Sequence, residues 1–148
     1  MRAALIVLCL ALLAICPPPP ARADTLAQAR AAAQAGQYQQ AVGLYSRVIE
    51  QEGLSGGELA RALHQRGLAW MNQGKLEAAL ADFNQALQAD QDLVAVYASR
   101  SLAYERKGLL ERAYVDAEWY AHYKPDDPQA RQRLRRLTRL MMSTPKKK

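Results

Sequence analysis

Two histidines, His64 and His122, are the side chains of this sequence best suited to acid–base or metal chemistry. They form no His-x-x-x-His pair, the sequence has no Cys-x-x-Cys motif, and no carboxylate cluster has the spacing of metal ligands. The glycine-rich stretch at 53–57 (GLSGG) lacks the lysine and the preceding strand of a phosphate-binding loop. We therefore interpret Ser55 as a loop residue or a helix cap. The sequence predicts no enzyme, no cofactor and no metal site.

The two cysteines, Cys9 and Cys16, lie in a first segment that differs from the rest of the chain. An apolar run at 3–15 is followed by four prolines and by Ala21-Arg22-Ala23. This order is typical of a secretory signal peptide at 1–23, cut after Ala23. It predicts a periplasmic or secreted protein whose mature form has no thiol, so that packing alone must stabilise it.

Two alternatives for this first segment remain open. It could be an uncleaved membrane anchor, although the apolar run is shorter than the roughly 20 residues of a spanning helix. Cys16 could also be lipidated, because Leu13-Ala14-Ile15 before it resembles the bacterial lipoprotein box, although Ile15 is larger than that box prefers.

Charge is distributed unevenly along the remainder. Residues 24–127 carry 10 basic and 14 acidic side chains, whereas eight basic and no acidic side chains follow from Pro128 onward. The basic patch consists of Arg131, Arg133, Arg135, Arg136, Arg139 and Lys146 to Lys148. Such a patch favours an anionic membrane surface or an acidic protein as partner. Nucleic acid is not expected if the protein is exported, and the patch could equally be the solvated face of a helix followed by a disordered end.

The elements that would position these residues are helices. Ala, Leu, Gln, Glu and Arg dominate the sequence up to about residue 142, and no strand-like alternation competes with them. Gly36, Gly74 and Gly108 each interrupt a helical segment, which indicates pairs of helices joined by tight turns. The sequence predicts an all-α fold.

One pattern occurs twice in the sequence at a constant spacing. Trp70 aligns with Tyr104, Gly74 with Gly108, and Ala79 with Ala113. With two helices in each period of about 34 residues, this pattern resembles the tetratricopeptide repeat family. The resemblance implies a helix-turn-helix solenoid, in which small residues allow close helix contact and Trp70, Phe83 and Tyr104 fill the space between units.

The resemblance divides the chain into a series of segments. These are a signal peptide at 1–23, three units at about 24–53, 60–91 and 94–125, a capping helix at 128–142 and a basic, disordered tail at 143–148. The first unit lies farther from the second than the second does from the third, so extra residues are inserted near 52–57. In the third unit Ala117 replaces the expected aromatic residue, and we expect Trp119 and Tyr120 to supply the missing bulk.

The resemblance also implies a concave groove, lined by the first helix of each unit, that binds a peptide or helix of another protein. The residues expected to line it are Leu26, Arg30, Arg61, His64, Leu68, Met71, Asn72, Ala98, Leu102, Glu105 and Arg106. The apolar strip Leu68, Met71 and Leu102 could bind hydrophobic anchors between Arg61 and Arg106, or could pack against neighbouring helices instead.

The groove is not expected to grip a chaperone tail. The lysine–asparagine clamp that some family members use is not reproduced, because Ala27, Gln65 and Ser99 stand at one of its repeat positions. His64 is expected to face solvent. The most direct interpretation of the sequence is an exported adaptor that binds a partner protein, and the alternative is a membrane-associated accessory protein acting through its basic end.

Overall fold

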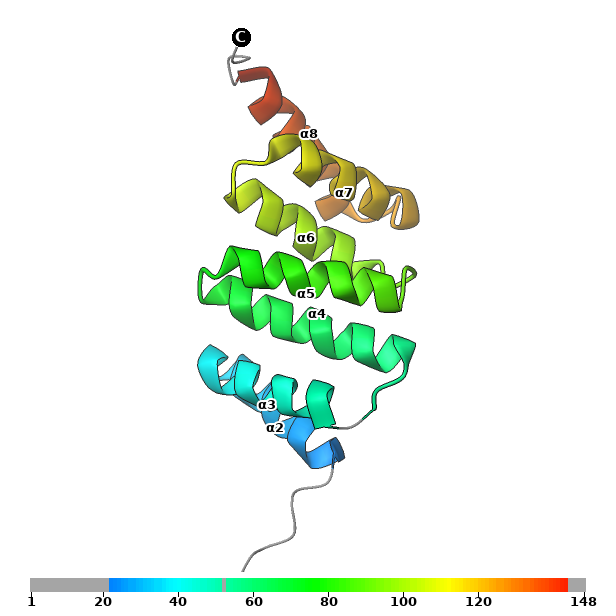
Figure 1. Cartoon of the computed structure of the whole chain (residues 1–148). Coiled ribbons are helices and arrows are strands. Elements are labelled where there is room, and N and C mark those ends of the chain that lie inside the picture. Colours follow the sequence, from blue (N-terminus) through cyan, green and yellow to red (C-terminus); the bar gives the residue numbers. More distant parts are fainter. Residues whose placement is uncertain (1–21, 52, 144–148) are drawn as a thin grey trace, which may run out of the picture.

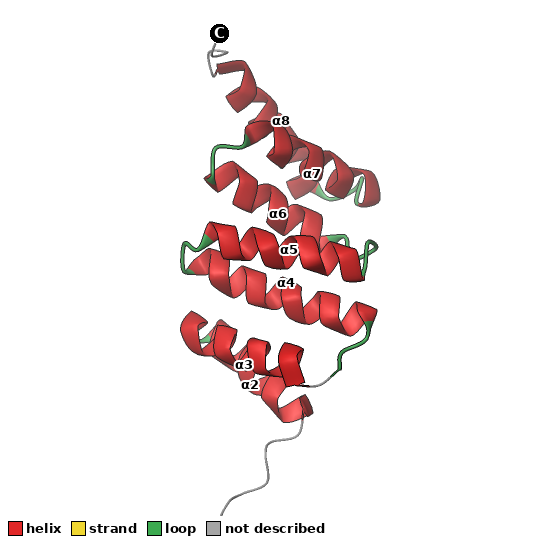
Figure 2. Cartoon of the chain, in the orientation of Figure 1, coloured by secondary structure: helices red, strands yellow, loops and turns green. Residues whose placement is uncertain are grey.

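The computed structural model describes residues 22–51 and 53–143. This part of the chain forms α-helices joined by short loops and contains no strand (Figure 2), which confirms the all-α prediction. The expected signal peptide, up to residue 21, and the expected basic tail from residue 144 lie outside the described residues. Within the described part, no helix is long and apolar enough to cross a membrane.

The described residues form seven helices, stacked in chain order as antiparallel pairs from α2 at one end to α8 at the other (Figure 1). Their bounds are α2 Arg22–Gln34, α3 Tyr38–Gln51, α4 Gly56–Asn72, α5 Leu76–Ala89, α6 Ala95–Arg106, α7 Leu110–Tyr123 and α8 Pro128–Ser143. Each helix packs against the next, so that α2–α3, α4–α5 and α6–α7 form three units and α8 covers the last.

The turn inside each unit depends on a glycine. Gly36, Gly74 and Gly108 have φ angles of 75°, 75° and 74°, in the left-handed region that other residues adopt only with strain. Because all three turns share this conformation, the two helices of every unit pair in the same way.

The loop between the first and second units is longer than the turns within them. It ends at Ser55, whose backbone N–H and hydroxyl both donate to Glu58 Oε2, at 3.4 and 3.0 Å. This arrangement satisfies groups at the start of α4 and confirms that Ser55 is a helix cap.

Aromatic side chains join the units as expected. Phe83 is fully buried, and Gly67 on α4 lies so close to its ring that there is no room for a larger residue. Trp70 is half-buried and packs against the apolar clusters of the first and second units. Tyr104, its counterpart in the third unit, makes the equivalent contact between the second and third units.

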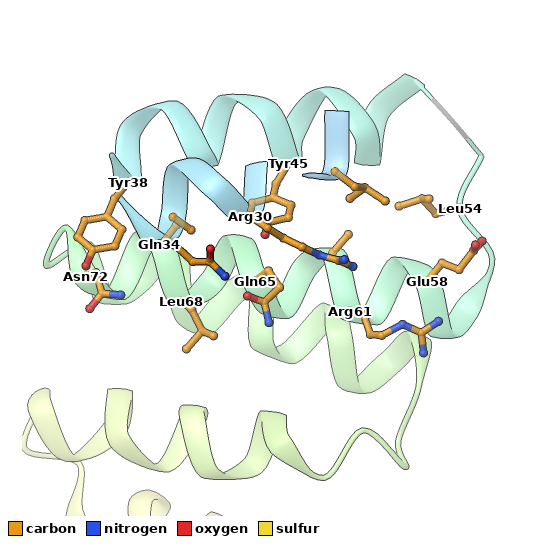
Figure 3. A pocket seen from close by; sticks show the side chains of 14 residues that line it. Arg30, Gln34, Tyr38, Tyr45, Leu54, Glu58, Arg61, Gln65, Leu68 and Asn72 are labelled. Carbon is orange, nitrogen blue, oxygen red and sulfur yellow. The ribbon is translucent and has the colours of Figure 1, made fainter. Parts of the chain in front are cut away.

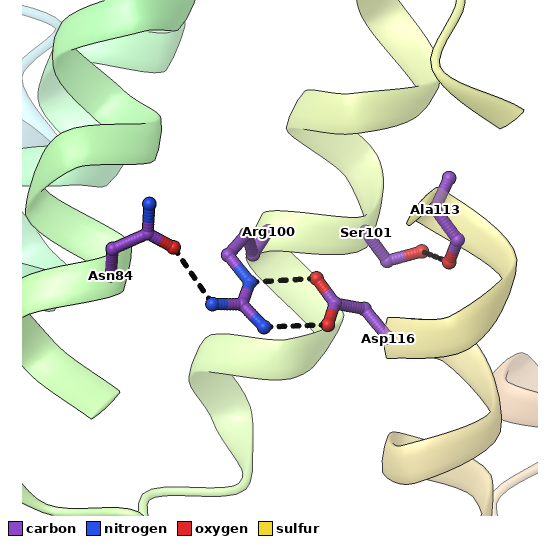
Figure 4. A network of polar contacts seen from close by, with 5 residues as sticks. All are labelled: Asn84, Arg100, Ser101, Ala113 and Asp116. Carbon is purple, nitrogen blue, oxygen red and sulfur yellow. Dashed lines mark hydrogen bonds and ion pairs between the residues drawn. The ribbon is translucent and has the colours of Figure 1, made fainter. Parts of the chain in front are cut away.

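Two partly buried arginines reinforce the same seams. Arg66 donates from Nε and Nη2 to both carboxylate oxygens of Asp82, at 2.8 and 2.7 Å, and from Nη1 to Ser46 of the preceding unit. Arg100 repeats this arrangement with Asp116 and with Asn84 of the preceding unit (Figure 4).

The last helix, α8, covers the third unit with an apolar face. Leu137 is fully buried among α7 side chains, and Asp127 Oδ1 accepts a hydrogen bond from the Gln129 backbone at the start of α8. The expectation for Trp119 was wrong. Trp119 is 48% exposed and stacks on Tyr97 and Tyr123 at the surface, so it does not fill the space left by Ala117.

Candidate functional site

A cleft of about 630 Å³ lies between the first and second units, and we call it the inter-unit cleft (Figure 3). It is bounded by α2, α3 and α4 and by the loop at Leu54. Among its lining residues are five that the sequence placed in the groove, namely Leu26, Arg30, Arg61, Leu68 and Asn72. The first half of the predicted groove is therefore an open cleft.

The inter-unit cleft carries two arginines. Arg30 on α2 extends across its middle, whereas Arg61 on α4 points toward the end near Glu58 (Figure 3). Both arginines are exposed, and neither makes an ion pair within the described residues. Glu58 lies at one end of the cleft, where it accepts hydrogen bonds from Ser55, whereas Arg30 lies at the middle. The centre of the cleft is therefore electropositive.

Apolar and amide side chains complete the lining. Leu26 and Leu68 are half-buried and offer apolar surface, while Gln34, Gln65 and Asn72 offer amide groups. Amides both donate and accept hydrogen bonds, as a peptide backbone does. The inter-unit cleft thus combines apolar contact with backbone-like hydrogen bonding, and its described lining contains no pair of groups arranged for proton transfer.

Tyr45 on α3 also lines the inter-unit cleft, and the sequence had placed it only in the packing of the first unit. Its side chain is 1% exposed, and its hydroxyl has no hydrogen-bond partner in the described part of the chain. Burial raises the pKa of Tyr45, while the nearby charge of Arg30 acts in the opposite direction. The sequence signal that could have identified it is a comparison with Phe83, its counterpart in the second unit, which has no hydroxyl.

The second half of the predicted groove is closed. His64, expected to face solvent, is only 8% exposed; its Nε2 lies 2.9 Å from Ser99 Oγ, and its ring packs against Phe83. Burial lowers the pKa of His64 to about 4, so the ring is neutral at ordinary pH. His64 therefore joins α4 to α6 and does not line an opening.

The apolar strip predicted for the groove is divided by the structure. Met71 is 5% exposed and belongs to the core, so its expected exposure was wrong. Leu102 is half-buried against the same core, which is the packing alternative. Arg106 donates to the backbone oxygen of Met71 at 3.3 Å and thereby ties α6 to α4. Of the strip, Leu68 is the residue that lines the inter-unit cleft.

Helix α8 covers what remains of that half. Arg136 forms an ion pair with Glu105 at 2.7 Å, and Arg133 donates to the backbone oxygen of Ala98. Two of the five arginines of the basic patch thus hold α8 on α6. The other three, Arg131, Arg135 and Arg139, are exposed and make no ion pair within the described part of the chain.

Metal chemistry has no obvious place in this part of the molecule. Within residues 22–51 and 53–143, no three histidine, cysteine or carboxylate side chains are grouped so that they could hold an ion. His122, the other histidine, lies on the exposed face of α7 beside Tyr123.

Comparison with known proteins identifies the repeat and the fold. Residues 60–93, which form most of the second unit, match the tetratricopeptide repeat family. No curated protein sequence matches the chain.

Solved structures resemble the whole stack. The first TPR domain of Spaghetti (RPAP3), bound to the HSP90 peptide SRMEEVD, superposes with a TM-score of 0.75 at 20% identity, covering 82% of this chain and 94% of that one. The second TPR domain of human RPAP3, in complex with the HSP70 peptide SGPTIEEVD, has a TM-score of 0.69 at 25% identity, with 77% and 92% covered. The Sgt2 TPR domain from Aspergillus fumigatus has a TM-score of 0.73 at 18% identity, with 84% and 82% covered.

Proposed function

Because this chain is a tetratricopeptide-repeat protein, we propose that it is a protein-interaction module that binds a peptide or helix of a partner in the inter-unit cleft. The observation that carries the proposal is the cleft itself, which opens between the first and second units and is lined from α2, α3 and α4. Two structural neighbours that bind peptides, both RPAP3 domains, support it as relatives of the same fold. The proposal assigns no catalytic step to the protein.

The lining of the inter-unit cleft suits an extended peptide. Its volume of about 630 Å³ accommodates a few side chains, and Leu26 and Leu68 offer contact for an apolar one. The amides of Gln34, Gln65 and Asn72 are available to pair with the peptide backbone, which loses its water on binding. Affinity would come from apolar burial, and the amides would fix the direction of the chain.

The test starts from peptides that the wild-type protein selects from a displayed random library, with affinities then measured by calorimetry. Asn72→Trp places a large ring at the exposed rim of the inter-unit cleft and should abolish binding without disturbing the core. Gln88→Trp makes the same change on an exposed part of α5 outside the cleft and is the matched control.

Two results would count against the proposal. Peptides that bind Asn72→Trp as tightly as wild type would move the binding site elsewhere. A library that yields no binder at all would refute the peptide-binding function.

We further propose that the protein acts after export, as an adaptor for another component of the cell envelope. The support is the sequence pattern at 1–23, with its apolar run and the Ala21-Arg22-Ala23 site. Mass spectrometry of protein expressed in a bacterium and recovered from the periplasm should give an N-terminus at Asp24. An intact N-terminus in the cytoplasm would contradict the export proposal and leave the binding proposal unaffected.

A second candidate function is attachment to an anionic membrane surface through α8. It is favoured by the line of exposed arginines Arg131, Arg135 and Arg139, spaced four residues apart on one helix face and without ion pairs to the rest of the described chain. Each should contribute about 1 kcal/mol near an anionic bilayer. Vesicles of phosphatidylglycerol should sediment the protein at low salt, and changing all three to Gln should release it. The control is the double variant Arg47→Gln with Arg112→Gln, which changes exposed arginines outside α8. If this control and the triple variant sedimented equally with the vesicles, the role of α8 would be excluded.

A further inference from the structure

The exposed face of α7 carries a row of large apolar side chains that do not pack inside the stack. Val115, Trp119 and Tyr123 recur every four residues, which places them on one ridge of the helix, and they are between 45% and 51% exposed. Trp119 also stacks on Tyr97 of α6, with ring centroids 6.1 Å apart, so the aromatic surface continues onto the neighbouring helix. Exposed clusters of this kind mark interaction surfaces. We call Val115, Trp119 and Tyr123 the α7 row.

Acidic side chains accompany the α7 row. Glu111 and Glu118 lie on the same side of α7, are exposed and form no ion pair within the described residues. Glu118 also borders an open hollow of about 300 Å³, where its carboxylate lies beside apolar surface. The hollow is lined by Val115, Glu118, Trp119 and His122.

The arginines nearest to the α7 row have other partners. Arg100 lies 5.7 Å from the centre of the Tyr97 ring, but its charge is balanced by two hydrogen bonds to Asp116. Arg112 lies over the ring of Tyr104. The charges beside the α7 row are therefore mainly acidic, and an occupant that brings both apolar surface and positive charge is complementary to it.

The chain itself contains a surface of this composition on α8. Arg131, Arg135 and Arg139 also recur every four residues, are exposed and make no ion pair within the described part of the chain, and we call them the α8 row. Met142, which is exposed as well, lies at the end of the same helix face. Four residues of α-helix rise about 6 Å, so the α7 row and the α8 row have the same spacing.

We propose that two copies of this protein associate by packing the α8 row of one copy on the α7 row of the other. Ridges formed by every fourth residue pack into grooves of the same kind in the commonest class of helix packing. The apolar stems of the arginines cover the α7 row, while their guanidinium groups lie over the aromatic rings and pair with Glu118. Pairing of α7 with α7 is disfavoured, because it would bring the carboxylates of both copies together.

Both rows lie at the end of the stack opposite to α2 and α3, so the inter-unit cleft stays open in the assembly (Figure 1). Because each copy presents both rows at this end, a two-fold arrangement makes the contact twice and closes the assembly at a dimer. The helix faces that meet are small, so we expect a weak dimer, with a Kd on the order of 10–100 μM.

Sedimentation velocity of the purified protein measures this association. The mean mass should rise toward that of a dimer between about 5 and 500 μM, a range that spans the expected Kd. Two variants each remove one surface, and each should weaken the association about tenfold or more. The α8 variant combines Arg131→Gln, Arg135→Gln and Arg139→Gln, and the α7 variant combines Glu118→Gln with Trp119→Ala.

Matched controls change exposed groups at the other end of the stack. Arg47→Gln with Arg61→Gln is the control for the α8 variant, and Glu50→Gln is the control for the carboxylate of the α7 variant. Both controls should dimerise as wild type does. Circular dichroism of all variants verifies that each is folded before its mass is interpreted.

Mixing the α7 variant with the α8 variant tests that two different surfaces meet. The α8 row of the α7 variant is intact, and so is the α7 row of the α8 variant, so one of the two contacts can form between them. The mixture should therefore contain a one-to-one dimer that neither variant forms alone at the same concentration. A mixture that stays monomeric while wild type dimerises would contradict the pairing of α8 with α7.

The other outcomes assign the two rows differently. Wild-type protein that is monomeric at about 1 mM, or an α8 variant that dimerises as wild type does, refutes the self-association. If wild type is monomeric and only the α8 variant fails to sediment with phosphatidylglycerol vesicles, the arginines serve the membrane instead. None of these results affects the peptide-binding proposal, because its test uses Asn72→Trp in the inter-unit cleft.

Discussion

Gly67 offers the sharpest test of how the stack is packed. An alanine Cβ at this position would lie 2.6 and 2.9 Å from two ring carbons of Phe83 and 3.3 Å from the Ala79 carbonyl oxygen. Ordinary carbon–carbon contacts are about 3.5–4.0 Å, so the methyl group would overlap the ring by about an ångström. Phe83 is fully buried, so its ring is enclosed by neighbouring groups.

The expected change in the free energy of unfolding is the difference between two opposing effects. Replacing glycine by alanine inside a helix gains about 1 kcal/mol from backbone entropy alone. Overpacking of a filled core costs about 1–3 kcal/mol, and the short contacts to a buried ring favour the upper end of that range. We therefore expect Gly67→Ala to lower the free energy of unfolding by about 2 kcal/mol.

Gly43 is the matched control for this substitution. It lies inside α3, is exposed, and an alanine Cβ there would have no neighbour within 4 Å. Gly43→Ala should therefore raise the free energy of unfolding by about 1 kcal/mol, which makes the two variants differ by about 3 kcal/mol. Urea denaturation followed by far-ultraviolet circular dichroism measures both. If Gly67→Ala gained stability as Gly43→Ala does, close contact between α4 and α5 would not explain the glycine.

Three further predictions concern the seams of the stack. Trp70→Ala should lower the free energy of unfolding by about 3 kcal/mol, measured by urea denaturation, because Trp70 packs between two units; an unchanged melting curve would contradict the assigned repeat register. Asp116→Ala should cost about 3 kcal/mol or more by leaving the partly buried Arg100 unpaired, whereas Arg100→Met with Asp116→Leu should cost clearly less, and equal losses would argue against the ion pair. The pKa of His64 is about 4 in the folded state, below the unfolded value of about 6.5. Its contribution to the free energy of unfolding is therefore fully present above pH 6.5 and is lost as the pH falls toward 4. Urea denaturation at pH 7.5 and 5 should therefore show a loss of about 2 kcal/mol that His64→Gln lacks, and the same loss in both proteins would assign it to other groups.

The fold could be predicted because the sizes of the side chains determine how closely neighbouring helices can pack. Gly67 and Ala79 permit close helix contact, Trp70 and Tyr104 fill the seams, and the same order of small and large residues returns in the next unit. These effects are local to neighbouring helices and depend little on the rest of the molecule.

The candidate site could be predicted only in part, because openness depends on how far apart whole helices lie. Leu68 and Met71 are three residues apart on α4, yet Leu68 lines the inter-unit cleft and Met71 is buried. Between α4 and α6 the groove is closed by the hydrogen bonds that His64 and Arg106 make across these helices. Neither hydrogen bond can be predicted from residue types alone. Comparison with Phe83 could have singled out Tyr45 in the sequence, but the lack of a partner for its hydroxyl within the described residues depends on what surrounds it in space.

The repeated arginine contacts have a consequence for how such a chain could lengthen. Arg66, Asp82 and Asn84 all lie within the block 60–93. This block therefore contains an arginine that donates to the preceding unit and an amide that accepts from the arginine of the following unit. A tandem duplication of this block would join to itself through the same bonds. The array could grow from its middle while the inter-unit cleft at one end and α8 at the other stayed as they are.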